Sequence, residues 1–239
     1  MKSLSSLLKK VSCLSILISL VACVQMPKQA FNRSVNTDIK TIAILEPATL
    51  GEIDIVNLGH PGLGFGLIGA MIAGADRSAK TDEFTKMAKE KLFDYVSEYK
   101  SNLTKALENV GYTVTTIPVK RTSSTGFMKS YGDLDPSVDA YLDIGLMCGF
   151  FSASATADYI PTVRSEVRLI KRKTKEVLYQ EIVSYGYDAK FLEAISIPAD
   201  EKYYFKDFVA LKGNADAAIV GLRTGLPLVA DQIANDIRQ

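Results

Sequence analysis

The fold is decided by the stretch IKTIAILE at residues 39–46. Apolar side chains occur on both alternating sides of this stretch, with Ala43 and Leu45 on one side and Ile42 and Ile44 on the other. A strand that is apolar on both sides is typical of a sheet covered on both faces. We therefore expect residues 39–46 to form an inner strand packed between two layers.

Outward from this strand, the sequence alternates between helical and extended patterns. We expect a long amphipathic helix over 81–109 broken near 95–99, strands over 112–119 and 138–151, a loop over 120–135, a hairpin of 162–171 with 176–185, and a helix from Asn214 towards Ile237. Gly221, Gly225 and Pro227 should kink or split the last helix. The order predicts a single mixed α/β domain, in which a mixed β-sheet is packed by the long amphipathic helix and the C-terminal helices.

Residues 58–75, which precede the long helix, are rich in glycine and apolar side chains. Every fourth residue is small, and these residues form our candidate interaction segment: Gly62, Gly66, Ala70 and Gly74. Such a stripe lets backbones approach closely, so one interpretation is a surface helix that inserts shallowly into lipid or self-associates. The other is a helix packed on the domain's own sheet. We favour the second, because 14 apolar residues are too few for the roughly 20 of a membrane span.

The N-terminus has the pattern of an export signal. Three lysines precede a run of about 12 mostly apolar residues, which is short of the roughly 20 needed to span a bilayer. The run ends in LVAC at 20–23, which resembles the lipobox of bacterial prolipoproteins. That resemblance implies cleavage before Cys23 and acylation of Cys23, for example with palmitate. Cys13 lacks the apolar residue three positions earlier that a lipidated cysteine needs.

The domain organisation follows from this signal. We expect a signal peptide at 1–22, a lipidated N-terminus and flexible tether at 23–38, and one periplasmic domain at 39–239. An ordinary secretory peptide or an uncut N-terminal anchor is the alternative. In enteric lipoproteins, an aspartate directly after the lipidated cysteine retains the protein at the inner membrane. Here that position is Val24, so by analogy we expect the protein at the outer membrane.

Composition limits the partners of the mature chain. The precursor has a formal net charge of +1, and removal of three signal lysines leaves −2. This charge gives no strong field for nucleic acid. Cleavage at Cys23 leaves Cys148 as the only other cysteine, so no intramolecular disulfide can form. The remaining 217 residues suffice for one apolar core, which must provide the stability.

No motif in the sequence predicts catalysis or metal binding. His60 is the single histidine and has no neighbours at metal-ligand spacing. Cys148 lies in the apolar run 144–151, which is typical of an inert core thiol. Two carboxylate pairs could serve acid–base chemistry, but we favour turn and structural roles for them: Asp133 with Asp135, and Asp139 with Asp143. We expect no catalytic residue, no metal and no cofactor other than the covalent lipid.

Three segments together resemble a group of bacterial envelope lipoproteins. They are KTIAILEP at 40–47, the Leu-x3-Leu-x3-Gly-Tyr-x-Val pattern at 103–114, and DAYLDI at 139–144 followed by a long hairpin. The chain looks like the curli-secretion-channel domain, the penicillin-binding-protein activators, the Tol-Pal propeller N-terminal domain and, most of all, uncharacterised lipoproteins with a Gly-rich segment. The resemblance covers 39–186 and implies a small α/β fold that binds other envelope proteins.

The chain departs from this group in two ways. The sequence shows neither the two amphipathic hairpins of a curli-type barrel nor a residue set for activating a peptidoglycan synthase. We therefore predict a non-enzymatic, lipid-anchored protein of the outer membrane that faces the periplasm. It would bind another envelope protein or form a homo-oligomer. A subunit of a secretion or export assembly is the alternative, and an envelope hydrolase is a third.

Overall fold

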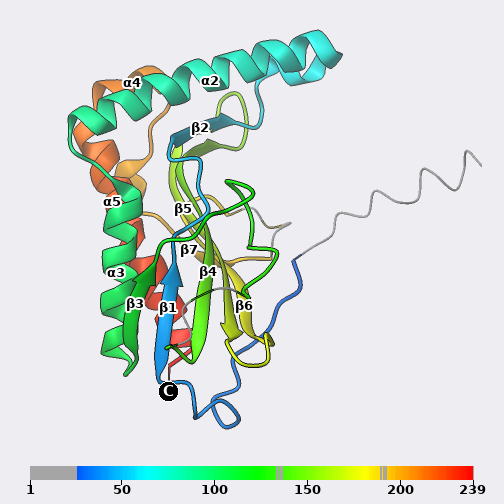
Figure 1. Cartoon of the computed structure of the whole chain (residues 1–239). Coiled ribbons are helices and arrows are strands. Elements are labelled where there is room, and N and C mark those ends of the chain that lie inside the picture. The colour runs from blue at the N-terminus through cyan, green and yellow to red at the C-terminus, as the bar shows by residue number, and fades with distance from the viewer. Residues whose placement is uncertain (1–25, 133, 135–136, 189, 191–192, 239) are drawn as a thin grey trace, which may run out of the picture.

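The computed structural model describes residues 26–238 except 133, 135–136, 189 and 191–192. Its strands are β1 Thr41–Leu45, β2 Ile53–Asn57, β3 Thr113–Ile117, β4 Ala140–Ser152, β5 Ile160–Lys171, β6 Val177–Tyr185 and β7 Ile195–Ile197. Its helices are η2 Pro61–Gly64, α2 Gly66–Glu90, α3 Tyr95–Asn109, η4 Glu201–Tyr203, α4 Phe208–Gly213 and α5 Ala215–Asp236. The predicted single mixed α/β domain is confirmed (Figure 1).

The sheet has seven strands and a mixed topology. Its order is β3-β1-β4-β5-β6-β7, and β2 pairs with the part of β4 that β1 leaves free. β4 runs antiparallel to β5, and β5 antiparallel to β6, so the predicted hairpin is confirmed. β1 lies parallel to both β3 and β4. It is therefore an inner strand, as its apolar pattern predicted.

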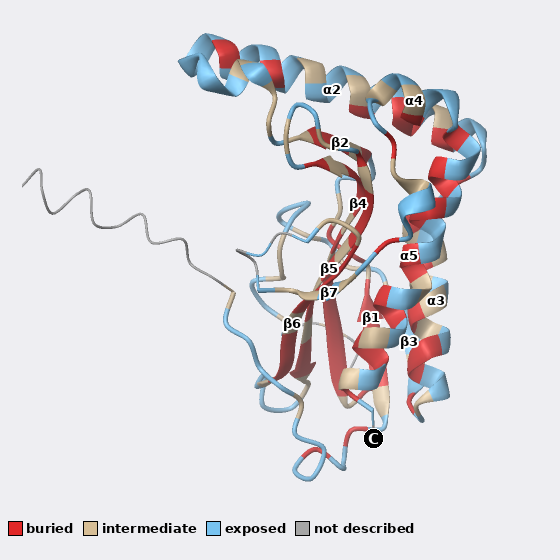
Figure 2. Ribbon diagram, turned by 180° about the vertical axis from the view of Figure 1, so that it is seen from behind, coloured by how far each residue is buried: buried red, intermediate tan, exposed pale blue. Residues whose placement is uncertain are grey.

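Two different layers cover β1. On one face, Ile42 and Ile44 belong to a core cluster shared with α3 and α5 (Figure 2). On the other face, Ala43 and Leu45 pack beneath side chains from the segment between β3 and β4. Among the residues that the structure describes, this second cover contains no helix and consists mainly of side chains from the loop after β3, which include Val119, Met128 and Tyr131. The loop therefore substitutes for the second helical layer of a typical α/β sheet.

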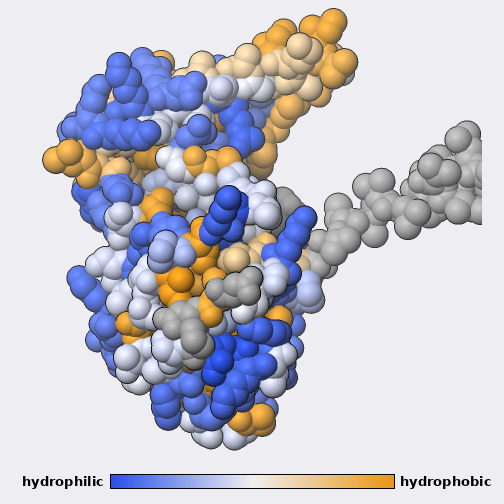
Figure 3. Space-filling model, in the orientation of Figure 1, coloured by the Kyte–Doolittle hydropathy of each residue, from blue (hydrophilic) through white to orange (hydrophobic). Residues whose placement is uncertain are grey.

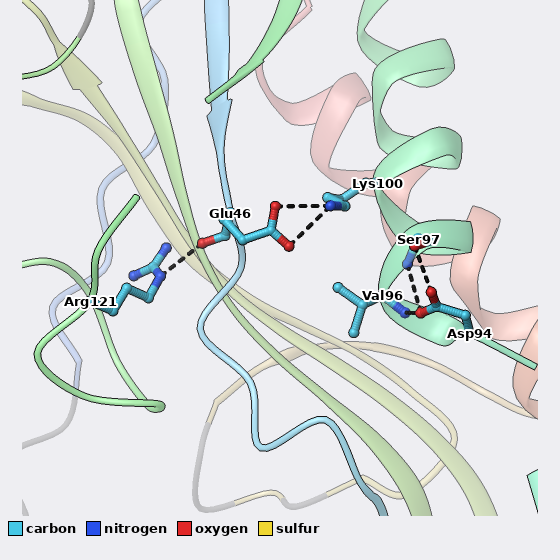
Figure 4. Close-up of polar contacts among 6 residues, drawn as sticks. All are labelled: Glu46, Asp94, Val96, Ser97, Lys100 and Arg121. Atoms are coloured by element: carbon cyan, nitrogen blue, oxygen red, sulfur yellow. Dashed lines mark hydrogen bonds and ion pairs between the residues drawn. The ribbon is translucent and has the colours of Figure 1, made fainter. Parts of the chain in front are cut away.

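The long helix differs from its prediction in start and break. α2 begins at Gly66 instead of residue 81, so it includes most of the glycine-rich segment. The break lies at 91–94, where Leu92 has a left-handed φ of 56°, and not at 95–99. Asp94 then caps α3, because its Oδ1 accepts hydrogen bonds from the N–H groups of Val96 and Ser97 at 3.1 Å (Figure 4).

The C-terminal helix is one continuous α5, although we expected its glycines and proline to kink or split it. Its glycines allow aromatic rings to approach. A Cβ at Gly225 would lie 2.3 Å from the ring of Tyr185, and one at Gly221 would lie 2.9 Å from Tyr203. These positions therefore serve packing against the sheet and η4, and they do not end the helix.

β2 was not predicted, and α2 stabilises it through two threonines. The backbone N–H of Ile55 donates to Oγ1 of Thr81 at 3.0 Å, and the N–H of Ile53 donates to Oγ1 of Thr85 at 2.9 Å. Both threonine side chains are buried. One turn of α2 thus satisfies the strand edge that lies away from β4, which would otherwise present unpaired donors.

Candidate functional site

A group of exposed apolar side chains occupies one end of the domain, the apolar tip, which we define as residues 61–75. It comprises η2 and the first ten residues of α2 and projects beyond the sheet (Figures 1 and 2). Its six large apolar side chains are 51–79% exposed: Leu63, Phe65, Leu67, Ile68, Met71 and Ile72. They form the hydrophobic projection in Figure 3. Contiguous apolar surface of this kind marks interaction sites.

The favoured interpretation of the glycine-rich segment, packing on the domain's own sheet, is wrong. Only two small residues of the tip are buried, Gly69 and Ala73. A Cβ at Gly69 would lie 2.0 Å from the carbonyl oxygen of Gly62, so η2 folds back directly onto α2. The tip therefore packs mainly on itself, and the apolar side chains on its other side face solvent.

The predicted stripe of Gly62, Gly66, Ala70 and Gly74 does not form one helical face. Gly62 lies in η2, and Gly66 is the first residue of α2, with a φ of +63° that favours glycine. Ala70 and Gly74 are exposed in α2. The buried side of α2 in this segment carries Gly69 and Ala73, each one residue before the predicted Ala70 and Gly74, and Gly62 precedes the start of α2.

Charged residues gather where the tip joins the body. Asp76 lies 2.6 Å from Nζ of Lys80 and 3.7 Å from Nε2 of His60. Arg77 forms a two-point contact with Asp54 on β2, at 2.6 and 3.0 Å. We call these five residues the polar collar. The collar separates an uncharged end from a charged, packed remainder of α2.

The candidate catalytic residues are engaged elsewhere. Nδ1 of His60 accepts a hydrogen bond from the Gly62 N–H at 3.0 Å and caps η2. Cys148 is fully buried, and burial raises the pKa of its thiol. A buried thiol with a raised pKa has little of the thiolate that reacts. Among the described residues, no cluster of metal ligands occurs.

The carboxylates of Asp139 and Asp143 are occupied by structural hydrogen bonds and an ion pair. Oδ2 of Asp139 accepts bonds from the N–H groups of Lys40 and Thr41 at 3.0 and 2.9 Å. Burial acts to raise the pKa of Asp139, but these bonds outweigh it and lower that pKa. Asp143 is 0% exposed and binds Arg121 at 2.7 Å. Asp133 and Asp135 lie outside the described residues.

A cavity of about 240 Å³ lies beside β4 and β5. Its charged lining comes from Glu52, Asp54, Arg164 and Glu166, and Arg164 lies 3.5 Å from Glu166. Neither His60 nor Cys148 lines this cavity. The hydrolase hypothesis requires a pocket that joins His60 to a nucleophile or to paired acids. This cavity has acidic side chains in its lining, but it does not join them to His60.

The N-terminal segment lies against the body from Pro27 onwards. Gln29 and Gln180 of β6 exchange backbone hydrogen bonds at 2.9 and 2.8 Å, and Lys28 lies 3.1 Å from Glu181. Further along, Arg33 donates to the Asn235 carbonyl at 2.9 Å. Several residues of the segment that we expected to be a flexible tether are thus bound to the body of the domain.

The signal peptide and Cys23 lie outside the described residues, so their cleavage and lipidation stay predictions. Within the described part of the chain, no helix is both long and apolar enough to cross a membrane.

Comparisons with known proteins give few matches. No family model matches the chain, and no curated protein matches it. Among solved structures it is similar to protein XCC0632 from Xanthomonas campestris (TM-score 0.39, 10% identity, 89% of this chain and 93% of that one). It is also similar to PelC from Paraburkholderia phytofirmans, solved as a dodecamer (0.33, 9%, 90% and 97%), and to lipoprotein GNA1162 from Neisseria meningitidis (0.22, 14%, 64% and 90%). These TM-scores support no conclusion about function, and the resemblance to the curli-secretion-channel group stays a prediction.

Proposed function

We propose that this protein is a non-enzymatic, lipid-anchored component of the cell envelope whose α/β domain is a binding module. The observation that carries this proposal is the apolar tip, with six large apolar side chains more than half exposed. Isolated exposed apolar residues are ordinary, but a contiguous group on a projecting helix costs solubility and indicates a binding surface.

Two further features support the proposal. The lipobox at 20–23 provides a membrane anchor, and with Val24 it directs the protein to the outer membrane, where the domain faces the periplasm. Of the side chains considered for catalysis that the structure describes, His60 caps η2, Cys148 lies in the core and Asp139 binds backbone N–H groups. A binding role explains why the apolar side chains of the tip are exposed, whereas hydrolase activity does not.

We expect Cys23→Ser to abolish lipidation, because the thioether needs the cysteine sulfur. Cells grown with an alkyne analogue of palmitate should label the unchanged protein and lose the label in this variant. Cys13→Ser is the matched control and should keep the label. Label retained by Cys23→Ser, or lost in Cys13→Ser, would contradict the assignment of the lipidated residue.

We expect a photo-crosslinking amino acid at Ile68 to give specific adducts in cells. Ile68 is 74% exposed, so the probe does not disturb the core. The same probe at Ser101, an exposed position of α3, is the control. Adducts, with lipid or with protein, should form at position 68 and be absent at 101, as judged by the intact mass of the purified protein. Equal yields at the two positions would refute the tip as the binding surface.

A further inference from the structure

The apolar tip has a composition and shape suited to a lipid bilayer. Residues 61–75 contain no charged side chain. At about 100° per residue, Leu67, Met71, Ile68 and Ile72 cover roughly 140° of the helix circumference. This continuous apolar side, opposite the buried Gly69 and Ala73, matches helices that lie in the interface with one face in the acyl region.

The polar collar has the position that an interfacial helix requires. His60, Asp76 and Lys80 contact one another, and Arg77 contacts Asp54. Charged side chains next to an apolar end remain in the headgroup layer, where water and lipid phosphates solvate them. A protein partner would not require charge to begin abruptly one helical turn after the last large apolar side chain.

The N-terminal segment determines which side of the domain faces the membrane. Because Pro27–Gln29 are bound to β6, only residues 24–26 separate the docked segment from Cys23. The four residue steps from Cys23 to Pro27 reach at most about 14 Å. The acyl chains on Cys23 therefore hold the β6 side of the domain close to the bilayer surface.

The tip projects towards that same side. In Figure 1 the described chain begins at the right of the body, and the free end of α2 also extends to the right; Figure 2 shows both on the left. A surface held near the bilayer meets lipid at a high effective concentration, before it meets a dilute protein.

From these observations we infer that the apolar tip inserts into the leaflet that carries the acyl chains of Cys23. The inference rests on the proposed lipidation and names the ligand of the proposed binding surface. The protein then has two attachments to one leaflet, and they fix the orientation of the sheet relative to the membrane. An orientation fixed in this way leaves the opposite side of the domain accessible in the periplasm.

The test uses the mature, lipidated protein in vesicles of phosphatidylethanolamine and phosphatidylglycerol. A Leu67→Cys variant carries an NBD fluorophore; acylated Cys23 and buried Cys148 do not compete for the label. Ser101→Cys with the same label is the control. We expect blue-shifted emission at position 67 and quenching by doxyl-labelled lipid several-fold stronger than at 101.

A second variant checks that the apolar side chains cause the insertion. Ile68→Ser with Met71→Ser should reduce quenching at position 67 to the level of position 101. Both side chains are more than two-thirds exposed, so thermal stability should not change. Undiminished quenching in this variant would overturn the role given to these side chains.

Other outcomes would overturn the inference in distinct ways. Water-like emission at position 67 would exclude insertion. A blue shift that grows with protein density at constant lipid would indicate a second copy of the chain. A shift seen only in native membranes would indicate a protein partner. Intact mass spectrometry of the same sample reports lipidation separately: an unlipidated protein contradicts the proposed anchor, whereas a lipidated protein with a hydrated tip contradicts only the insertion.

Discussion

Replacing Asp143 with alanine is expected to lower the free energy of unfolding by about 3–5 kcal/mol. Asp143 lies in β4 and is 0% exposed. Its carboxylate accepts bonds from Arg121, from the Met128 N–H and from the Tyr131 hydroxyl, each at 2.7 Å. Alanine would leave a buried guanidinium and two further donors without their acceptor, and truncation of one partner of a buried pair is strongly destabilising.

The loss of stability in Asp143→Ala should be greatest in the loop that covers β1. Arg121 also donates to the Glu46 carbonyl at 2.8 Å (Figure 4), so it joins the loop to the end of β1. Met128 and Tyr131 belong to the cover over Ala43 and Leu45. We therefore expect the loop to lose hydrogen-exchange protection along with the global loss measured by urea unfolding.

Asp38→Ala is the control for Asp143→Ala. Asp38 pairs with Lys171 at 2.8 Å, but its side chain is 60% exposed. Water screens such a pair, and its removal should leave the unfolding midpoint almost unchanged. Similar losses of unfolding free energy in the two variants would mean that burial does not determine how much Asp143 contributes to stability.

The sequence was sufficient to predict the parts of the fold that local patterns determine. The apolar pattern of 39–46 correctly gave an inner strand, and the hairpin of β5 and β6 followed from two β-rich runs around a polar turn. The C-terminal helix begins at the predicted place, because Asn214 occupies the N-cap position of α5. In each of these cases the signal lies within a few residues of the element.

Elements that depend on distant partners could not be predicted in this way. β2 is five residues long and owes two of its hydrogen bonds to threonines 26 and 32 positions away. The continuity of α5 depends on tyrosine rings that fill the space at its glycines. In the sequence, Asp143 is paired with Asp139 four residues earlier. In the structure, its buried carboxylate binds Arg121, which lies in a loop 22 residues away.

The exposure of the tip was also beyond prediction, for a different reason. A run of apolar residues is normally buried, because burial removes its surface from water. The second half of α2 packs on the body through four buried side chains, whereas the first half buries only Gly69 and Ala73, although the helix is continuous. Which half lies on the body is determined by Phe84 and its neighbours, since that is where α2 meets β2 and β4. The apolar half is then left to face its surroundings.

Replacing Phe84 with alanine is expected to lower the free energy of unfolding by about 3–5 kcal/mol. Phe84 is 0% exposed, and its ring meets the Phe150 ring edge-on with centroids 5.6 Å apart. Phe150 in turn meets Phe205 at 5.9 Å. Truncation would open a cavity between α2 and β4 that this rigid aromatic row cannot fill. Urea unfolding measures the loss, and hydrogen exchange should show α2 loosening before the central sheet.

Phe65→Ala is the matched control on the same helix, because Phe65 is 78% exposed at the start of α2. It should change stability by no more than about 0.5 kcal/mol. In labelled vesicles, the variant with the smaller effect on stability should have the larger effect on insertion. Phe65→Ala should weaken quenching at the tip, whereas Phe84→Ala should retain it wherever the domain remains folded. If Phe65→Ala instead cost as much stability as Phe84→Ala, the tip would be part of the core and would not be free to bind. The two phenylalanines thus separate the half of α2 that holds the fold from the half proposed to meet the membrane.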